Sequence, residues 1–337
     1  MKKLFTLFLF FQFSLGIAMA QKPLPIIDMH MHAVSINDFG PPPVHICSPF
    51  THWSAKDAKG NGMNYYIDVI TNKLMCNGKA LLSPKTDEEL MRENFAVMQK
   101  YNVFGVTSGP YELVKKWERA NPQRIIPAVM FDFKSKIPLA DLKNWFRKDS
   151  LKVFGEVTTQ YEGISLSDSI MEPYLAMAEE LDIPVSVHVG PGPPGVRYFG
   201  DPRYRATLHS ALVVEEALVR HPKLRVILAH SGWPMIDDLK ALLYTHPQVY
   251  VDLGIICYAF PKEEFYDYLK AIVKAGFEKR ICFGSDQMIW PQAIAEGIET
   301  IQKAPFLTAN QKRDILYNNA ARFLRLSDGQ IKKHHEK

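Results

Sequence analysis

Short apolar runs alternate with longer amphipathic segments from residue 25 nearly to the C-terminus. An apolar run bounded by turn residues predicts a buried strand, and apolar residues recurring every three or four positions predict a helix. Such alternation is typical of an α/β protein with a parallel sheet. The eight predicted strands are residues 26–30, 103–107, 125–131, 153–157, 185–189, 225–229, 249–253 and 280–284.

A helical pattern follows each predicted strand. One begins at Thr86, whose hydroxyl can cap the helix while Glu89 bonds back to its start. Eight strands, each followed by a helix, favour a (β/α)8 TIM barrel, although the pattern alone also fits a doubly wound sheet. The other predicted helices are residues 111–119, 139–147, 170–181, 208–220, 235–245, 263–275 and 292–302.

Two segments interrupt the alternation. Residues 33–85 are far longer than an ordinary strand-to-helix loop, so we expect a lid or side wall over the barrel mouth. Residues 190–206 begin with Gly-Pro-Gly-Pro-Pro-Gly and then contain Arg197, Tyr198 and Arg203. Both arginines can fork a substrate carboxylate or phosphate, although a single arginine here is more often a surface residue of a mobile loop. Tyr198 can form a pocket wall, but an aromatic residue at this place is equally typical of the core of the loop.

The first twenty residues have the layout of a secretory signal peptide. Lys2 and Lys3 precede a short apolar run, and Ala18-Met19-Ala20 forms a small-residue cleavage site. Because the apolar run is shorter than the roughly 20 residues that span a bilayer, we expect cleavage rather than anchoring. The mature protein would then be periplasmic or secreted, without membrane contact, as one domain over residues 21–326 with a flexible tail over 327–337.

Charge argues against a nucleic-acid partner. The formal net charge is +4, and loss of Lys2 and Lys3 lowers it by two, leaving a near-neutral chain without a basic block. We expect a small-molecule substrate instead. The oligomeric state stays open, a homo-oligomer included.

The four cysteines are too scattered for a zinc knuckle or a disulfide scaffold. Cys47 and Cys76 share the long segment after the first strand, so we expect them to pair in an oxidising compartment. Cys257 and Cys282 lie in apolar runs and are expected to be core residues.

The strongest chemical signal is the pair His30 and His32 at the end of the first strand. Alternate strand residues share a face, so both imidazoles point the same way and can bind one ion. The pair also lies at the strand edge where barrel active sites form. A chance His-x-His pair on the surface is the plain alternative.

Four further candidates lie at the same edge. Taken singly, a histidine or carboxylate at a strand end is more often structural than a ligand. Together they supply the imidazole and carboxylate set that binds zinc, iron or manganese. They are Glu156, His188, His230 and Asp286.

These residues give the chain a resemblance to the amidohydrolase superfamily, in the branch with His-Ser-Gly-Trp-Pro after strand six. The resemblance covers nearly all of the mature chain. It includes residues 28–32, His188 with the turn after it, 230–234, 284–286 and 318–323. It implies an enzyme with one or two divalent ions, zinc being the expected metal. The substrate does not follow from it, because this fold hosts many reactions.

The resemblance implies two arrangements. In the two-metal pattern Asp286 is also general base and proton donor, and the reaction is hydrolysis of an ester, lactone, amide or related bond. The ligands are then His30, His32 and Asp286 for one ion, His188 and His230 for the other, and Glu156 as the bridge.

In the one-metal pattern His230 is left free as an acid and base, and the reaction is decarboxylation or another lyase step. An inactive metal-binding protein is a third interpretation, which the complete ligand set disfavours. The discriminating residue is Glu156: a side chain in the barrel lumen favours two metals, and one packed behind the sheet favours one.

Overall fold

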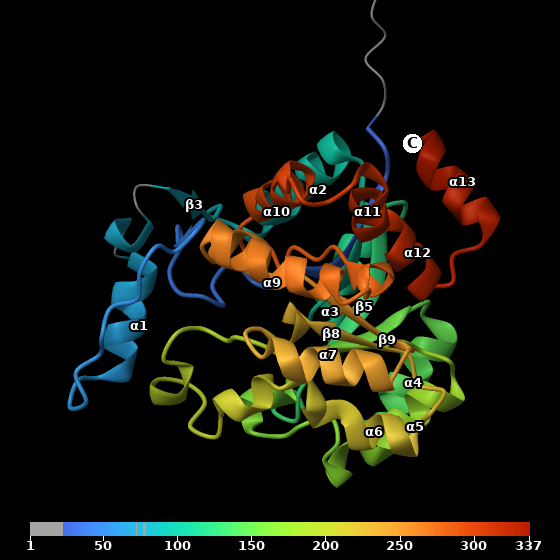
Figure 1. Cartoon of the computed structure of the whole chain (residues 1–337), viewed down its shortest axis with the longest axis horizontal. Coiled ribbons are helices and arrows are strands. Elements are labelled where there is room, and N and C mark those ends of the chain that lie inside the picture. The colour runs from blue at the N-terminus through green and yellow to red at the C-terminus, as the bar shows by residue number, and fades with distance from the viewer. Residues whose placement is uncertain (1–22, 72, 77–78) are drawn as a thin grey trace, which may run out of the picture.

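The computed structural model describes residues 23–71, 73–76 and 79–337, so the predicted signal peptide lies outside the described residues. Eight parallel strands form one sheet in the order β1-β4-β5-β6-β7-β8-β9-β10, and Met29 N–H donates to the carbonyl of Phe283 beside β10 (2.8 Å). The first and last strands therefore meet in a nearly closed barrel (Figure 1), which confirms the TIM barrel.

All eight predicted strands are present, with ends that differ by one or two residues at most. Every strand is buried along nearly its whole length, because its outer face packs under helices and its inner face fills the barrel. The strands are β1 (Ile26–His32), β4 (Val103–Ser108), β5 (Ile125–Phe131), β6 (Val153–Val157), β7 (Val185–His188), β8 (Val226–Ala229), β9 (Val249–Asp252) and β10 (Ile281–Cys282).

One main helix follows each barrel strand along the chain. Thr86 caps the first of them by accepting from Glu89 N–H (3.1 Å), whereas the Glu89 side chain accepts from Lys85 N–H instead (3.0 Å). The helices are α2 (Asp87–Tyr101), α3 (Tyr111–Ala120), α4 (Leu139–Lys148), α5 (Glu172–Glu180), α6 (Glu215–Arg220), α7 (Ile236–Thr245), α9 (Lys262–Lys274) and α10 (Gln292–Lys303), with the short α8 (Ile256–Ala259) before α9.

The single helix predicted over 208–220 is interrupted in the structure. Residues before Glu215 form two 3-10 turns, η5 (Ala206–His209) and η6 (Ala211–Val214), and only α6 is α-helical. Ser210 ends the first turn in extended backbone and caps the second by accepting from Leu212 N–H (3.2 Å). A serine that bonds to nearby backbone competes with a continuous helix, which explains the interruption.

The insertion after β1 is a small unit beside the barrel mouth. It contains an antiparallel pair, β2 (His45–Cys47) with β3 (Ala80–Leu82), and the helices α1 (Gly62–Thr71) and η1 (Lys73–Cys76). A disulfide joins Cys47 to Cys76, as expected, and Cys257 and Cys282 are free and buried.

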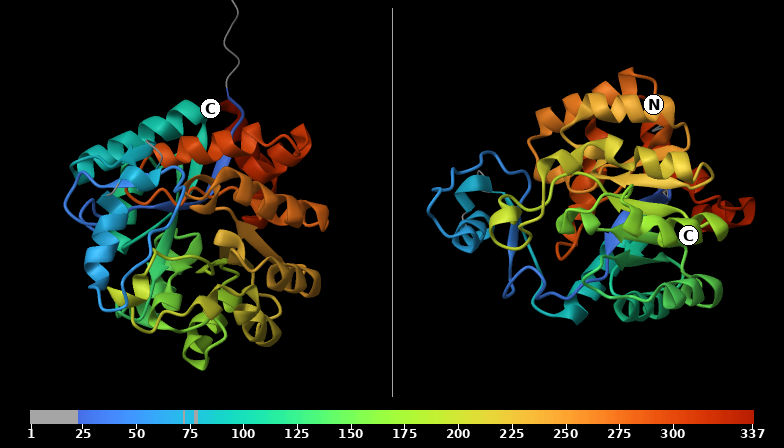
Figure 2. Two further views of the ribbon diagram at one scale, coloured as in Figure 1. Left: turned by 60° about the vertical axis from the view of Figure 1, so that its left-hand side comes forward. Right: turned by 90° about the horizontal axis from the view of Figure 1, so that it is seen from below.

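Helix α1 packs against the loop that follows β7. The ring of Tyr66 stacks on that of Phe199, with 4.4 Å between centroids, and a Cβ at Gly62 would lie 2.1 Å from the carbonyl oxygen of Tyr198. The insertion and the loop after β7 are therefore in direct contact (Figure 2). The insertion forms a side wall where the strands end.

The opposite end of the barrel is closed by apolar side chains and by the C-terminal helices. Ile27, Phe104 and Ile227, each the second residue of its strand, belong to one buried cluster with Tyr317 and Phe323. These last two residues come from η9 (Asp314–Asn318) and α12 (Asn319–Phe323), which follow α11 (Ala309–Arg313).

The segment expected to be a flexible tail over 327–337 contains helix α13 (Asp328–Glu336). Ser327 and Gln330 form a capping box at its start, and His334 stacks on Phe104 with 3.7 Å between ring centroids. A charged composition conceals this contact, because histidine packs as an aromatic ring as well as a polar group. No helix in the described part of the chain is long and apolar enough to cross a bilayer.

Candidate metal centre

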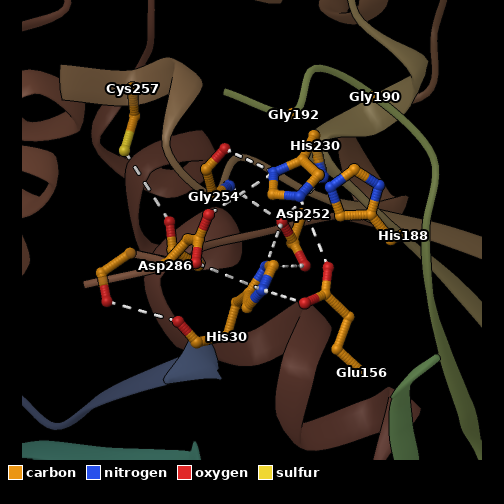
Figure 3. A network of polar contacts seen from close by, with 12 residues as sticks. His30, Glu156, His188, Gly190, Gly192, His230, Asp252, Gly254, Cys257 and Asp286 are labelled. Atoms are coloured by element: carbon orange, nitrogen blue, oxygen red, sulfur yellow. Dashed lines mark hydrogen bonds and ion pairs between the residues drawn. The ribbon is translucent and has the colours of Figure 1, made fainter. Parts of the chain in front are cut away.

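Seven polar side chains converge where the barrel strands end, and Figure 3 labels all of them except His32. Each lies at or just after the C-terminal end of a strand, the edge where barrel enzymes build their sites. All seven are buried, and the three most exposed retain only 5 to 6% of their surface. They are His30, His32, Glu156, His188, His230, Asp252 and Asp286.

His30 and His32 point to the same side of β1, as predicted. Their ring centroids are 5.0 Å apart. Both Nε2 atoms face Glu156 Oε2, at 3.4 Å from His30 and 3.7 Å from His32. Both also face Asp286 Oδ1, at 3.7 Å and 3.0 Å respectively. The two imidazoles and two carboxylates thus surround one point.

Glu156 belongs to a second group as well. Its other oxygen, Oε1, lies 3.4 Å from His230 Nε2, and the rings of His230 and His188 are 4.5 Å apart. Potential ligand atoms of His30, His32 and Glu156 lie within 4.8 Å of one another, and so do those of Glu156, His188 and His230. The Glu156 side chain therefore points into the lumen and is shared by both groups.

Each of the four histidines is held through Nδ1 by a second polar group. For three of them this partner is an oxygen that can only accept, so Nδ1 carries a proton, and in the neutral ring the Nε2 lone pair faces the centre. The pairs are His30 with Asp252 Oδ1 (3.4 Å), His32 with Ser108 Oγ (3.2 Å), His188 with Gln160 Oε1 (3.0 Å) and His230 with the Gly254 carbonyl (3.0 Å).

A cation fits this arrangement. His30 Nε2 and Glu156 Oε1 are buried without a hydrogen-bond partner, which is costly unless an ion or ligand contacts them. Imidazole nitrogen with carboxylate oxygen is a donor set for zinc and for manganese. Histidines fixed at Nδ1 by an outer acceptor are also the usual arrangement around a bound metal.

The electrostatics favour a cation too. Burial alone would raise the pKa of Glu156, but the charge of His30 and the close contacts with His230 and His30 hold it well below its ordinary value. Asp286 has a lowered pKa because His30 and His32 outweigh its burial. For His30, the negative charges of Glu156, Asp252 and Asp286 outweigh burial and raise its pKa well above normal. The centre is therefore built around ionised carboxylates that attract positive charge.

His188 differs from the other histidines. Burial, and then the charge of His230, lower its pKa to about 3. The ring is therefore neutral at ordinary pH. Because Nδ1–H donates to Gln160, Nε2 can accept, and the hydroxyl of Tyr161 lies 3.1 Å from it.

Sequence reasoning missed Asp252, Gln160 and Tyr161. Asp252 is the last residue of β9, and its Oδ1 also accepts from the backbone N–H of His230 (3.2 Å) and Gly254 (2.8 Å). The strand-end criterion that selected the other ligands would also have selected it. Gln160 and Tyr161 lie in the 3-10 turn η2 (Thr159–Glu162), which the sequence pattern did not indicate.

The three predicted substrate-binding residues lie on the surface of the loop after β7, and their role in binding substrate stays a prediction. Arg197 donates to the Pro202 carbonyl (2.6 Å), and Arg203 lies 3.8 Å from Glu162 with 64% of its side chain exposed. Tyr198 is 65% exposed. Among the contacts of the described residues, none joins these three side chains to the centre.

Comparisons with known proteins agree with this architecture. The sequence model of the family described as amidohydrolase matches residues 27–326. A search of curated proteins finds no significant match.

Solved structures of three proteins share the fold. A probable 2-pyrone-4,6-dicarboxylic acid hydrolase of Acinetobacter baumannii is 14% identical, with a TM-score of 0.56. A 5-carboxyvanillate decarboxylase of Sphingomonas paucimobilis is 16% identical, with a TM-score of 0.57. A zinc-bound amidohydrolase of Burkholderia multivorans is 16% identical, with a TM-score of 0.54. Each comparison covers 90% of this chain and 100% of the other. These low identities show a shared fold and leave the substrate open.

The position of Asp252 leads to a test of metal affinity. An Asp252→Asn substitution removes the negative charge that orients His30, so we expect zinc affinity to fall about 10- to 100-fold. Competition with a chromophoric chelator measures it. Asp237→Asn is the matched control, because Asp237 is exposed and pairs only with Lys240 on the surface of α7. Equal affinities in the two variants would contradict the role given to Asp252.

Proposed function

Because the chain belongs to the amidohydrolase family, we propose that it is an exported metal-dependent hydrolase that cleaves an ester, lactone, amide or related bond of a small molecule. The supporting observation is the position of Glu156. One of its oxygens faces His30 and His32, and the other faces His230. A carboxylate shared in this way is what a two-metal centre requires, and such centres activate water for hydrolysis.

In this proposal the residues divide into two sets around Glu156. His30, His32 and Asp286 would hold one ion, and His188 and His230 the other. Zinc suits the donors and is bound by the Burkholderia multivorans amidohydrolase. When bound, such ions supply a water of lowered pKa and polarise the substrate carbonyl.

Asp286 has the proton-transfer role. Its lowered pKa keeps the carboxylate ionised, so it can accept a proton as the water oxygen attacks the carbonyl carbon. It then returns that proton to the leaving group. Tyr258 steadies it, because the Tyr258 hydroxyl donates to the backbone carbonyl of Asp286 (3.1 Å).

Activity assays test the hydrolytic reaction. Zinc-loaded protein is expected to hydrolyse at least one member of a panel of p-nitrophenyl esters, simple lactones and N-acyl amides. Asp286→Asn should lower kcat about 10²- to 10⁴-fold because the general base is lost, while Asp237→Asn should retain activity. Zinc-loaded protein that cleaves no ester, lactone or amide would refute the proposal.

Metal analysis tests the two-metal arrangement directly. We expect about two zinc ions per chain in the parent and a clear loss in Glu156→Gln, because the amide cannot bridge as a charged carboxylate does. Elemental analysis of dialysed protein gives both values. A single ion in both proteins would instead leave His230 free as an acid and base and support a decarboxylase or other lyase.

Export is proposed on two observations. The first twenty residues have the signal-peptide pattern, and the insertion contains the Cys47–Cys76 disulfide, a bond that persists in oxidising compartments. The mature protein isolated from a secreting host is expected to begin at Gln21, as N-terminal sequencing would show. Intact protein that keeps Met1 and stays in the cytosol would contradict export.

A further inference from the structure

Tyr161 lies directly against the centre, although none of the roles above uses it. It follows Glu156 by five residues, in the turn η2 after β6. Its hydroxyl lies 3.1 Å from His188 Nε2, and the two ring centroids are 4.9 Å apart. The residue is half-buried, whereas His188 is buried. Tyr161 therefore lies on the outer side of a metal-ligand atom.

The Tyr161 ring is held in place by its neighbours. The ring of Tyr204 packs at 5.4 Å between centroids. On another side, a Cβ at Gly192 would lie 2.8 Å from Tyr161 Cε1, so the backbone of the Gly-Pro turn approaches the ring closely. Tyr204 also fixes that turn, because its hydroxyl accepts from Gly192 N–H (2.8 Å). The hydroxyl position is thus set by packing on both sides.

The hydrogen bond of Tyr161 uses an electron pair that a metal would need. His188 Nδ1–H donates to Gln160 Oε1, so the lone pair on Nε2 accepts from the Tyr161 hydroxyl. A cation bound at Nε2 takes the same lone pair and leaves the hydroxyl without that acceptor. A desolvated donor gains free energy by finding another acceptor, and a substrate oxygen bound beside the cation would supply one.

We propose that Tyr161 is a catalytic residue that donates a hydrogen bond to the substrate carbonyl oxygen as negative charge develops on it. This inference rests on the proposed hydrolysis. The water oxygen bonds to the carbonyl carbon, the carbonyl π pair moves to the carbonyl oxygen, and Asp286 takes the water proton. Tyr161 keeps its own proton throughout. The carbonyl then re-forms, the bond to the leaving group breaks, and that group receives the proton from Asp286.

Kinetics of Tyr161→Phe provide the first test. The substitution keeps the ring and removes only the hydroxyl, so we expect kcat to fall about 100-fold, as for loss of one oxyanion donor, with KM nearly unchanged. Tyr266→Phe is the matched control, because the Tyr266 hydroxyl donates to Thr300 on α10, outside the centre. A kcat equal to that of Tyr266→Phe would overturn the proposal.

Ligand binding gives a second readout that needs no turnover. Cobalt-substituted protein is titrated with methylphosphonate, a tetrahedral oxyanion, and the visible spectrum of cobalt reports binding. In Tyr161→Phe we expect methylphosphonate affinity to fall about 10-fold, while cobalt affinity is unchanged or higher because the competing hydrogen bond to His188 is gone.

The two readouts separate the possible failures. Lower cobalt affinity with unchanged methylphosphonate affinity would mean that Tyr161 only supports His188, and the proposal would be wrong. If the parent hydrolyses no substrate, the proposed function fails, and the methylphosphonate titration still decides whether Tyr161 binds an oxyanion. If the parent hydrolyses its substrate and Tyr161→Phe matches the parent in both readouts, only the inference fails.

Discussion

The hydrogen bond at Nδ1 of each central histidine is the interaction on which the site depends. It fixes the ring, and where the partner is an obligate acceptor it also determines which nitrogen is free. The four partners lie on different elements, Asp252 on β9 and Gln160 after β6 among them. Only a closed barrel brings these elements to one edge. Fold and chemistry are therefore coupled, because the centre is assembled from residues at the ends of separate strands.

Much of this could be predicted from the sequence. The eight strands were found because parallel strands buried on both faces read as continuous apolar runs. The candidate ligands were found because strand ends in a barrel share an edge; they include His30, His32, His188 and His230. Glu156 was identified as a candidate, but the direction of its side chain was left open. The alternation of side chains along a strand shows which residues share a face, but not which face points into the barrel. That requires the register between neighbouring strands.

What could not be predicted lies mainly in loops and short turns. Gln160 and Tyr161 are in a 3-10 turn, where no hydrophobic period marks the structure. Arg197 donates to the Pro202 carbonyl and Arg203 lies near Glu162, so their part in binding a substrate anion stays a prediction. The helix α13 was missed because its polar sequence conceals its contacts: a capping box at its start, His334 stacked on Phe104, and Ile331 against the buried cluster of Tyr317.

The contact between the insertion and the loop after β7 separates the border of the barrel mouth from the polar centre below it. Strand ends hold the candidate metal ligands. The mouth is bordered by two segments that pack on each other through Tyr66, Phe199 and the backbone near Gly62. One of them is cross-linked by a disulfide. Changes on their outer surfaces alter what enters without disturbing the histidines beneath. Substitutions in these two segments can therefore change substrate specificity during evolution while the histidines and carboxylates at the strand ends stay the same.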